Sequence, residues 1–490
     1  MSSDYGDIKK IICYHSHMEL NDYNLGDCLE LERKLSIFDK IYYRLIPKGY
    51  IYDADKRALL IPAGVKASWI EALTNRPLEM NYDADAASPM SIRLLTTPRN
   101  TLQKESLSFL AGKGKYKNYA KYSQLILNID TGEGKTYIAI ALMTIKRLKT
   151  MIIVNSSKIK SQWIKSLQDY TDIDPKSICE IVGSPKCNSI LENPDKYSQY
   201  KIFVTTHDTL RSFGDNHGWE KVHDLFRSLK IGVKIYDEAH LEFSNIVSID
   251  CYTNTKYTYY LTATFGRSNI SENFVYNNCF RTIPKFEQKG KSEYEGKRYI
   301  SYIGYFYKSN PTLIQINRLK NKYGFNRNAY ALYQLVDDEK FFDSVCRFID
   351  LMVVNKKCKT LLLMTTIEGI EDMKQYLIDR YPGVTIGTYH SKISPEEKEL
   401  SLKCDLIIST VKSLGVGADI PNLRAVINTE SYKSTIITEQ ILGRLRKLPN
   451  DELCYYIEII DGAFMTLKNQ QKSREKILKH LVGKILYIKE

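Results

Sequence analysis

Two short segments of the chain carry residue types that bind and cleave a nucleoside triphosphate. The first is a glycine-rich turn ahead of an apolar helical segment, in which Lys135 offers a positive charge to phosphate and Thr136 a hydroxyl to Mg²⁺. The second, 237–240, reads Asp-Glu-Ala-His and follows an apolar strand-like segment. The turn residues that we expect to contact the nucleotide are Thr131, Gly132, Glu133, Gly134, Lys135 and Thr136.

Asp237 and Glu238 supply the carboxylates that this chemistry needs. We expect Asp237 to hold Mg²⁺ and Glu238 to orient or deprotonate the attacking water, because phosphoryl transfer depends mainly on positioning and charge stabilisation. Either string alone also occurs in surface turns and solvated loops. Here both follow predicted strands, at 123–129 and 232–236, and ligands of open α/β sheets bind at the carboxyl ends of strands. Together the two motifs predict an enzyme that hydrolyses ATP with Mg²⁺.

Apolar strand-like segments alternate with amphipathic helical segments over most of the chain. This alternation predicts an α/β protein with parallel sheets that have helices on both faces. In the first α/β domain we expect strands at 151–154, 201–205, 233–236 and 258–262. In the second we expect strands at 360–364, 384–388, 405–409, 424–428 and 454–460, and a closing amphipathic helix at 468–490.

These patterns divide the chain into three expected parts. Residues 1–90 carry no nucleotide motif and indicate a small accessory domain that could bind DNA, with a hairpin within 42–62. The first α/β domain is expected at 91–275 and the second at 276–490.

Basic residues and tyrosines mix at about 283–328, and two interpretations of this segment remain open. One is an ordinary solvated β-ribbon. The other is a ribbon that faces nucleic acid, in which tyrosines stack on bases while Lys297 and Arg298 meet phosphates.

Composition agrees with a folded protein that has a polyanionic partner. The 490 residues carry a formal charge of +13 and a pI near 9.0, although many basic proteins bind nothing in particular. The ten cysteines are scattered without zinc-ligand spacing, which favours reduced thiols in a cytoplasmic protein. The N-terminus lacks the apolar core of a secretion signal, and no apolar stretch is long enough to cross a membrane. We expect a monomer in the cytoplasm, that of the host cell if the chain is phage-encoded.

Between residues 98 and 447 the chain resembles the superfamily 2 DExH helicases, because short strings follow one another in that family's motif order. The strings are 98–103, 131–136, 153–163, 204–207, 237–240, 261–264, 361–365, 407–421 and 440–444. Within the superfamily the chain is most similar to the group that contains UvsW, XPB and RecG, and to tailed-phage helicases that remodel branched DNA. The resemblance implies two tandem RecA-like domains.

The resemblance also implies roles for individual residues. Gln103 corresponds to the residue that binds adenine, and Gly417 and Asp419 to residues that face the nucleotide from the second domain. The residues implied to complete the hydrolytic cleft are Gln440, Arg444 and Arg446. The residues implied to hold a nucleic-acid backbone are Ser156, Lys158, Thr205, Thr206, Thr365 and Thr410, although short polar residues at strand ends also cap the following helix.

Three positions depart from the family pattern. Ile129 replaces a small residue at the start of the glycine-rich motif, and Asn155 replaces a proline. The second arginine of the last motif normally lies three residues after the first, where this chain has Lys447. Lysine cannot reproduce the bidentate geometry of a guanidinium, so we expect Arg444 with Arg446 to act on the phosphate.

Our leading hypothesis from the sequence is an ATP-dependent DNA helicase that unwinds or branch-migrates forks and four-way junctions in replication, recombination or repair. An RNA helicase is a second interpretation, because backbone-gripping motifs do not exclude ribose hydroxyls. A third is a nucleotide-gated clamp that holds nucleic acid without unwinding it.

Overall fold

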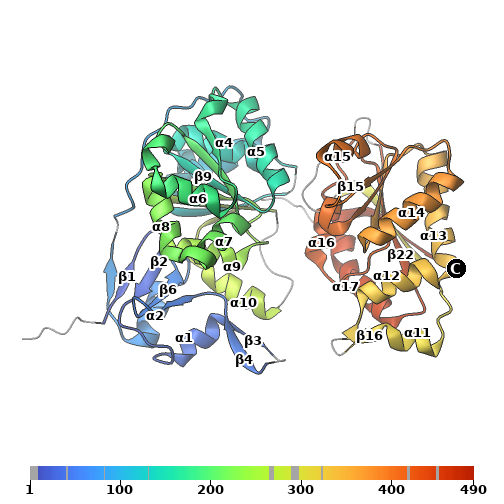
Figure 1. Ribbon diagram of the computed structural model, residues 1–490, viewed down its shortest axis with the longest axis horizontal. Helices are drawn as coiled ribbons and strands as arrows, with labels where there is room; N and C mark the ends of the chain where they lie inside the picture. The colour runs from blue at the N-terminus through green and yellow to red at the C-terminus, as the bar shows by residue number, and fades with distance from the viewer. Residues whose placement is uncertain are drawn as a thin grey trace, which may run out of the picture. The chain divides into compact units, whose positions relative to one another are not determined.

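The computed structural model describes residues 9–39, 42–81, 83–130, 132–263, 270–288, 297–321, 324–415, 420–448 and 452–490. Over these residues the chain forms two compact units, Met1–Gln288 and Lys289–Glu490 (Figure 1). The first unit holds an N-terminal sheet and a parallel α/β sheet, and the second holds another parallel α/β sheet. Both expected parallel-sheet domains are confirmed. In the described residues, no helix combines the length and the apolar character that crossing a bilayer requires.

The N-terminal region is a small sheet with strand order β5-β6-β2-β1-β7, accompanied by a separate ribbon of β3 and β4. Its elements are β1 (Ile11–Cys13), β2 (His17–Leu20), α1 (Leu29–Lys34), β3 (Ser36–Asp39), β4 (Arg44–Pro47), β5 (Ile51–Asp53), β6 (Ala58–Pro62), α2 (Ala67–Thr74) and β7 (Leu78–Met80). The expected hairpin is present as β5 and β6, which pair antiparallel with Ile51 opposite Leu60. The apolar residues of this sheet share one core with the first α/β domain, so the region is packed onto that domain.

The first α/β domain is a parallel sheet with strand order β10-β11-β9-β12-β13-β8-β14. Its strands are β8 (Gln124–Asn128), β9 (Thr150–Val154), β10 (Ile178–Glu180), β11 (Ile202–Thr206), β12 (Val233–Tyr236), β13 (Tyr257–Thr262) and β14 (Lys285–Glu287). Its helices are α3 (Thr101–Ala111), α4 (Lys135–Lys146), α5 (Ser157–Tyr170), α6 (Gly183–Glu192), α7 (His207–His217), α8 (Trp219–Ser228), α9 (Phe243–Tyr252) and α10 (Ile270–Cys279). Because β14 pairs with β8, the first unit extends through this strand.

Alternate side chains of each strand enter two different cores, since successive residues of a strand point to opposite faces of the sheet. On one face Ile152 and Ile235 belong to the core formed with α3, α4 and α5. On the other face Ile153 and Tyr236 belong to the core formed with α6 to α9 and the N-terminal sheet. Helices and the N-terminal sheet cover both faces of the parallel sheet. The residues of the two nucleotide motifs therefore lie at the carboxyl ends of β8 and β12, at one edge of the sheet.

The second α/β domain is a parallel sheet with strand order β19-β20-β18-β21-β22-β15-β23. Its strands are β15 (Lys297–Tyr307), β18 (Thr360–Met364), β19 (Ile386–Tyr389), β20 (Leu406–Thr410), β21 (Ala425–Asn428), β22 (Cys454–Asp461) and β23 (Val482–Lys489), with a short separate ribbon of β16 (Lys320–Asn321) and β17 (Gly324–Phe325). Its helices are α11 (Leu313–Arg318), α12 (Arg327–Val336), α13 (Glu339–Ile349), α14 (Ile367–Arg380), α15 (Pro395–Ser401), α16 (Thr435–Leu442) and α17 (Met465–Leu481).

Two expectations for this domain are wrong. Over β15, the tyrosine-rich segment is neither a solvated ribbon nor a ribbon that presents its tyrosines to bases, because β15 lies between β22 and β23 and buries Tyr302, Tyr305 and Tyr307. The side chains of Lys297 and Arg298, expected to meet phosphates there, lie outside the described residues. The closing helix ends at Leu481, and the chain continues as β23, of which Val482, Ile485 and Ile488 pack against the cores of the domain.

A buried ion pair anchors the strand that leads to Asp237. Lys234 on β12 is fully buried, and its Nζ lies 2.6 Å from Asp250 Oδ1 on α9. The Asp250 carboxylate also accepts hydrogen bonds from the hydroxyls of Tyr236, at 2.8 Å, and Tyr260, at 2.7 Å. These contacts join β12, β13 and α9 within one core. Each charge depends on the other because an unpaired charge is costly in an apolar interior.

We predict that Asp250→Ala destabilises the first unit by about 3–5 kcal/mol, because it leaves the Lys234 ammonium buried without its counter-charge. Urea denaturation followed by fluorescence measures this loss. The double variant Lys234→Met/Asp250→Asn removes both charges and keeps an acceptor for the two tyrosines, so it should lose less stability than Asp250→Ala. Equal destabilisation of the two variants would show that the ion pair is not what matters at this position.

Candidate active site

The glycine-rich turn between β8 and α4 has a backbone that suits glycine. Gly132 and Gly134 have φ angles of 89° and 90°, in the left-handed region that side chains disfavour. Glycine is required at position 134 for a second reason as well: a Cβ there would lie 2.5 Å from Gln103 Nε2. Helix α4 begins at Lys135, so its first N–H groups are directed toward the turn. Thr131 lies outside the described residues.

Gln103 and Arg99 connect the upstream segment to this turn. The Gln103 amide donates to the Glu133 carbonyl at 2.9 Å and accepts from the Arg99 backbone N–H at 2.9 Å. The Arg99 guanidinium donates to the Gly132 carbonyl at 2.6 Å. Both ends of the Gln103 amide are therefore used within the protein, and its contact with adenine stays a prediction. The sequence did not indicate that this residue braces the turn.

The structure brings Lys135, Asp237 and Glu238 together at the carboxyl ends of β8 and β12. Lys135 is 8% exposed, and its Nζ lies 3.4 Å from Glu238 Oε1 and donates to the Ile129 carbonyl at 3.4 Å. Asp237 accepts from the Trp163 indole N–H at 2.8 Å. In the sequence, Trp163 stands out only as part of the motif string 153–163. Its hydrogen bond to Asp237, the expected metal ligand, is therefore a contact that the sequence did not predict.

The two carboxyls have opposite electrostatic environments. Burial, together with the neighbouring charge of Glu238, raises the pKa of Asp237 to about 6. Burial alone would also raise the pKa of Glu238, but the Lys135 ammonium and His240 outweigh it and lower that pKa below its ordinary value. A carboxylate and a hydroxyl are oxygen ligands of the kind that Mg²⁺ prefers, so Asp237 and the partly exposed Thr136 fit this ion. Bound Mg²⁺ would neutralise phosphate charge and favour ionised Asp237.

His240 links the acidic motif to the end of the neighbouring strand. Its Nδ1 lies 2.9 Å from Thr262 Oγ1 on β13 and 3.4 Å from Glu238 Oε2. The Ala239 N–H also donates to the Leu261 carbonyl at 2.9 Å. Glu238 therefore has a direct polar path to Leu261 and Thr262, which belong to the string 261–264 of the family's motif order.

The residues expected to hold a nucleic-acid backbone differ in burial and in hydrogen bonding. Thr205 is fully buried and its hydroxyl donates to the Ile181 carbonyl at 3.2 Å, so the expectation is wrong for this residue. Ser156 and Thr206 cap α5 and α7, which was the stated alternative. The residues that are partly exposed are Ser156, Lys158, Thr365 and Thr410, and for these the contact stays a prediction.

The segment with the expected arginines lies in the second unit, on and after α16. Gln440 is buried, Arg444 is partly buried and Arg446 is exposed. Their action on the nucleotide stays a prediction, and Gly417 and Asp419 lie outside the described residues.

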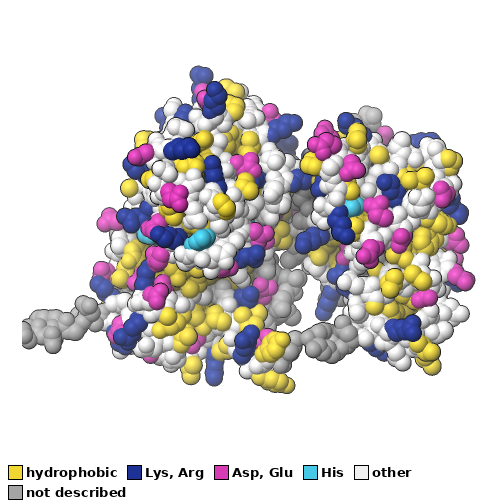
Figure 2. All heavy atoms as spheres, in the orientation of Figure 1, with side chains coloured by type: hydrophobic (Ala, Val, Ile, Leu, Met, Phe, Trp, Pro, Cys, Tyr) yellow, Lys and Arg dark blue, Asp and Glu magenta, His cyan; other side chains and the backbone are white. Residues whose placement is uncertain are grey.

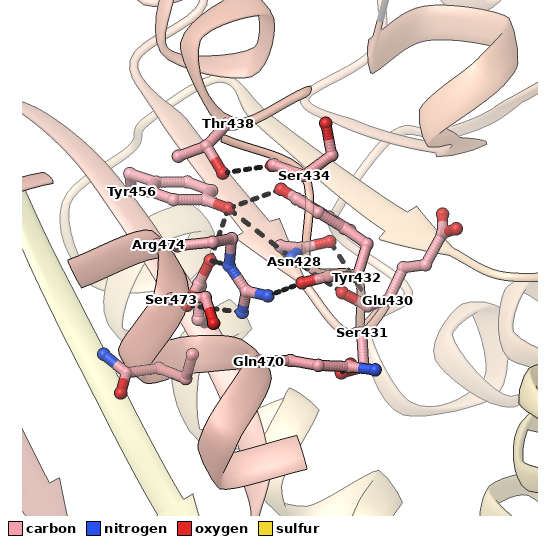
Figure 3. A network of polar contacts seen from close by, with 12 residues as sticks. Asn428, Glu430, Ser431, Tyr432, Ser434, Thr438, Tyr456, Gln470, Ser473 and Arg474 are labelled. Carbon is pink, nitrogen blue, oxygen red and sulfur yellow. Dashed lines mark hydrogen bonds and ion pairs between the residues drawn. The ribbon is translucent and has the colours of Figure 1, made fainter. Parts of the chain in front are cut away.

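A buried polar network holds the loop that precedes α16 (Figure 3). Arg474 on α17 makes two hydrogen bonds of 3.0 Å to the Glu458 carboxylate on β22 and donates to the Tyr432 carbonyl. The Tyr456 hydroxyl donates to Glu458 at 2.7 Å and lies 3.0 Å from the Tyr432 hydroxyl. Because Arg474 and Glu458 are both almost fully buried, the loop that leads to Gln440 is fixed to the sheet by a paired charge.

Comparisons with known proteins agree with the motif order. Residues 95–267 match the family model described as "Type III restriction enzyme, res subunit", and residues 342–448 match "Helicase conserved C-terminal domain". The chain is similar to "Transcript termination protein A18" of Yaba monkey tumor virus (strain VR587), with 23% identity over 79% of this chain and 77% of that protein. It is also similar to "Transcript termination protein OPG145" of Variola virus, with 23% identity over 98% of this chain and 87% of that protein.

A solved structure has the same fold. S. cerevisiae Dbp5 bound to RNA and ADP BeF3 aligns with 79% of this chain and 89% of that chain, with a TM-score of 0.52 and 14% identity. At this identity the likeness concerns the fold alone, and it confirms the expected pair of tandem RecA-like domains.

We predict that Glu238→Gln lowers the ATP turnover number by about 10²–10⁴-fold, because the variant keeps the side-chain shape and removes the proposed base. Steady-state phosphate release measures turnover, and a fluorescent ATP analogue should still bind. Glu396→Gln, at an exposed position of α15, is the matched control. Turnover at the wild-type rate would show that Glu238 is not the catalytic carboxylate.

We predict that Trp163→Phe raises the Mg²⁺ concentration needed for half-maximal ATP turnover, because Asp237 loses a hydrogen bond worth about 1.5–3 kcal/mol to a charged group. A Mg²⁺ titration at saturating ATP tests this. Trp219→Phe is the control, since Trp219 stacks on Tyr252 and has no bond to the acidic pair. An unchanged Mg²⁺ dependence would contradict the positioning role of Trp163.

Proposed function

We propose that this chain acts in transcript termination. Its matches to two helicase-family models support an ATP-hydrolysing nucleic-acid helicase or translocase of superfamily 2. In this proposal the enzyme uses ATP to move along nucleic acid and release an RNA from its template. The observation that carries the proposal is the cluster of Lys135, Asp237 and Glu238 in a chain that aligns almost end to end with viral transcript termination proteins. The formal charge of +13 supports a polyanionic substrate.

The described geometry suits a cycle of phosphate binding and release. Lys135 Nζ lies 3.4 Å from Glu238 Oε1 inside the site. We propose that the triphosphate takes over Lys135, which frees Glu238 to act on water while Asp237 and Thr136 hold Mg²⁺. The links from Glu238 through His240 to Thr262 then transmit the change to the segment that follows β13.

Remodelling of branched DNA is the second candidate. The motif order and the N-terminal sheet region motivated it, but the comparisons lend no support to branch migration or to recombination, repair and replication. Dbp5 was solved bound to RNA, and the similar viral proteins are named for transcript termination, so the first candidate is favoured. For either candidate we propose a monomer in the cytoplasm, where the free cysteines would stay reduced.

We predict ATP-dependent release of a fluorescent RNA from a synthetic transcription bubble, in which the RNA pairs with one strand of opened duplex DNA. Gel electrophoresis follows the release, with a four-way DNA junction and a tailed DNA duplex assayed beside it. The expected result is faster release of RNA than processing of the junction, and loss of all three activities in Glu238→Gln.

Three other outcomes would contradict parts of the proposal. Processing of the junction without release of RNA would favour the branched-DNA candidate. Opening of the tailed duplex alone would indicate a general unwinding enzyme. Nucleic-acid-stimulated ATP turnover with no strand separation on any substrate would favour translocation without unwinding.

A further inference from the structure

The ribbon of β3 and β4 presents aromatic side chains to solvent. Tyr43 is 82% exposed, Tyr42 68% and Phe38 54%. Phe38 lies opposite Leu45 in the ribbon, and Leu45 is exposed as well. Figure 1 shows the ribbon at the lower edge of the first unit, and hydrophobic side chains gather at that edge in Figure 2.

The fold does not need these rings. Ile37, next to Phe38 and on the opposite face of β3, is the residue of this strand that packs against the core. Tyr43 has a φ of 49°, a left-handed conformation in which turns ordinarily use glycine or asparagine. The Tyr43 ring contacts the Phe38 ring edge-on, with 6.4 Å between the ring centres, and both rings remain largely exposed to water. Large exposed rings, one of them in an unfavourable backbone conformation, point to a role in binding.

We propose that this aromatic ribbon, defined by Phe38, Tyr42, Tyr43 and Arg44, is a stacking site for the bases of single-stranded nucleic acid. This inference rests on the proposed nucleic-acid activity and adds where in the chain the strand is held.

The chemistry of the aromatic ribbon suits this ligand better than it suits an apolar protein surface. The described residues within 36–48 include two cations, Arg44 and Lys48, and one acid, Asp39. The Arg44 guanidinium lies 5.4 Å from the centre of the Tyr42 ring. Flat rings beside a guanidinium offer bases a stacking surface and phosphates a counter-charge, which is how proteins bind single strands without sequence preference.

The base of the ribbon is attached to elements that follow the nucleotide motifs. Lys48 Nζ donates to Ser244 Oγ at 3.3 Å on α9, the helix after the acidic motif. Gly49 packs so closely on α10, the helix that follows the segment 261–264, that a Cβ there would lie 2.8 Å from Cys279 Sγ. The proposed binding site for single-stranded nucleic acid is therefore attached to α9 and α10. These two helices follow Glu238 and Thr262, respectively, in the chain.

The test compares the binding of single-stranded oligonucleotide by the full chain and by four variants. Tyr42→Ala/Tyr43→Gly removes both rings and gives position 43 the residue that its φ favours, so loss of binding does not come from added strain. Tyr42→Phe/Tyr43→Phe keeps the rings. Tyr122→Ala is the matched control, since Tyr122 is another exposed ring with a lysine, Lys121, 5.3 Å from its centre.

We predict that Tyr42→Ala/Tyr43→Gly binds single-stranded oligonucleotide about tenfold or more weakly, from fluorescence anisotropy, while the Phe pair and Tyr122→Ala bind as the wild type does. An oligonucleotide carrying 2-aminopurine should be quenched by the wild type and the Phe pair only slightly by the ring-less variant. Arg44→Gln should flatten the slope of log affinity against log salt by about 0.7, the value of one phosphate contact on a single strand.

Wild-type affinity and quenching in Tyr42→Ala/Tyr43→Gly would overturn the stacking site and leave the proposed function intact, and the exposed rings would then have to meet a protein. If the wild type itself neither binds oligonucleotide nor shows nucleic-acid-stimulated ATP turnover, the proposed function fails together with the inference.

Discussion

The pairing of Lys135 with Glu238 is the contact on which the rest of the first unit depends. An ammonium and two carboxyls lie almost out of solvent at the edge of a sheet, where each charge is costly unless another compensates it. Lys135 comes from the helix after β8 and the carboxyls from the end of β12, so two loops must meet within a few ångströms. In the proposed cycle, a phosphate group replaces Glu238 as the partner of Lys135.

Contacts from several neighbouring elements hold Lys135, Asp237 and Glu238 in place. Trp163 holds Asp237 from α5, and His240 joins Glu238 to the end of β13. Beneath them, Lys234 and Asp250 fix β12 to α9 through a second buried ion pair. The strand that delivers the acidic pair is thus held at both ends by charge pairs. Such pairs contribute more to a defined geometry than to net stability, because the cost of desolvation offsets much of the attraction.

The second unit uses the same device for a different segment. Arg474 and Glu458 are buried as a pair, and Arg474 also holds the Tyr432 carbonyl in the loop before α16. In both units a buried charge pair lies behind a loop that carries the residues expected to act on phosphate. The aromatic ribbon of the N-terminal region shows the opposite arrangement, since its rings are left exposed to solvent.

The sequence by itself determined the features that depend on local chemistry and periodicity. The glycine-rich turn, the acidic pair and the alternation of strands and helices are encoded in neighbouring residues, and the two expected parallel sheets are present in the structure. Only the tertiary structure decided which side chains are covered. Tyr302, Tyr305 and Tyr307 look like a stacking surface in the sequence, yet parallel pairing with two distant strands buries them, while Tyr42 and Tyr43 stay exposed. Likewise, Trp163 reaches Asp237 and Arg474 reaches Tyr432 across long sequence separations. Burial and polar partners come from segments far apart in the chain, and no local pattern records them.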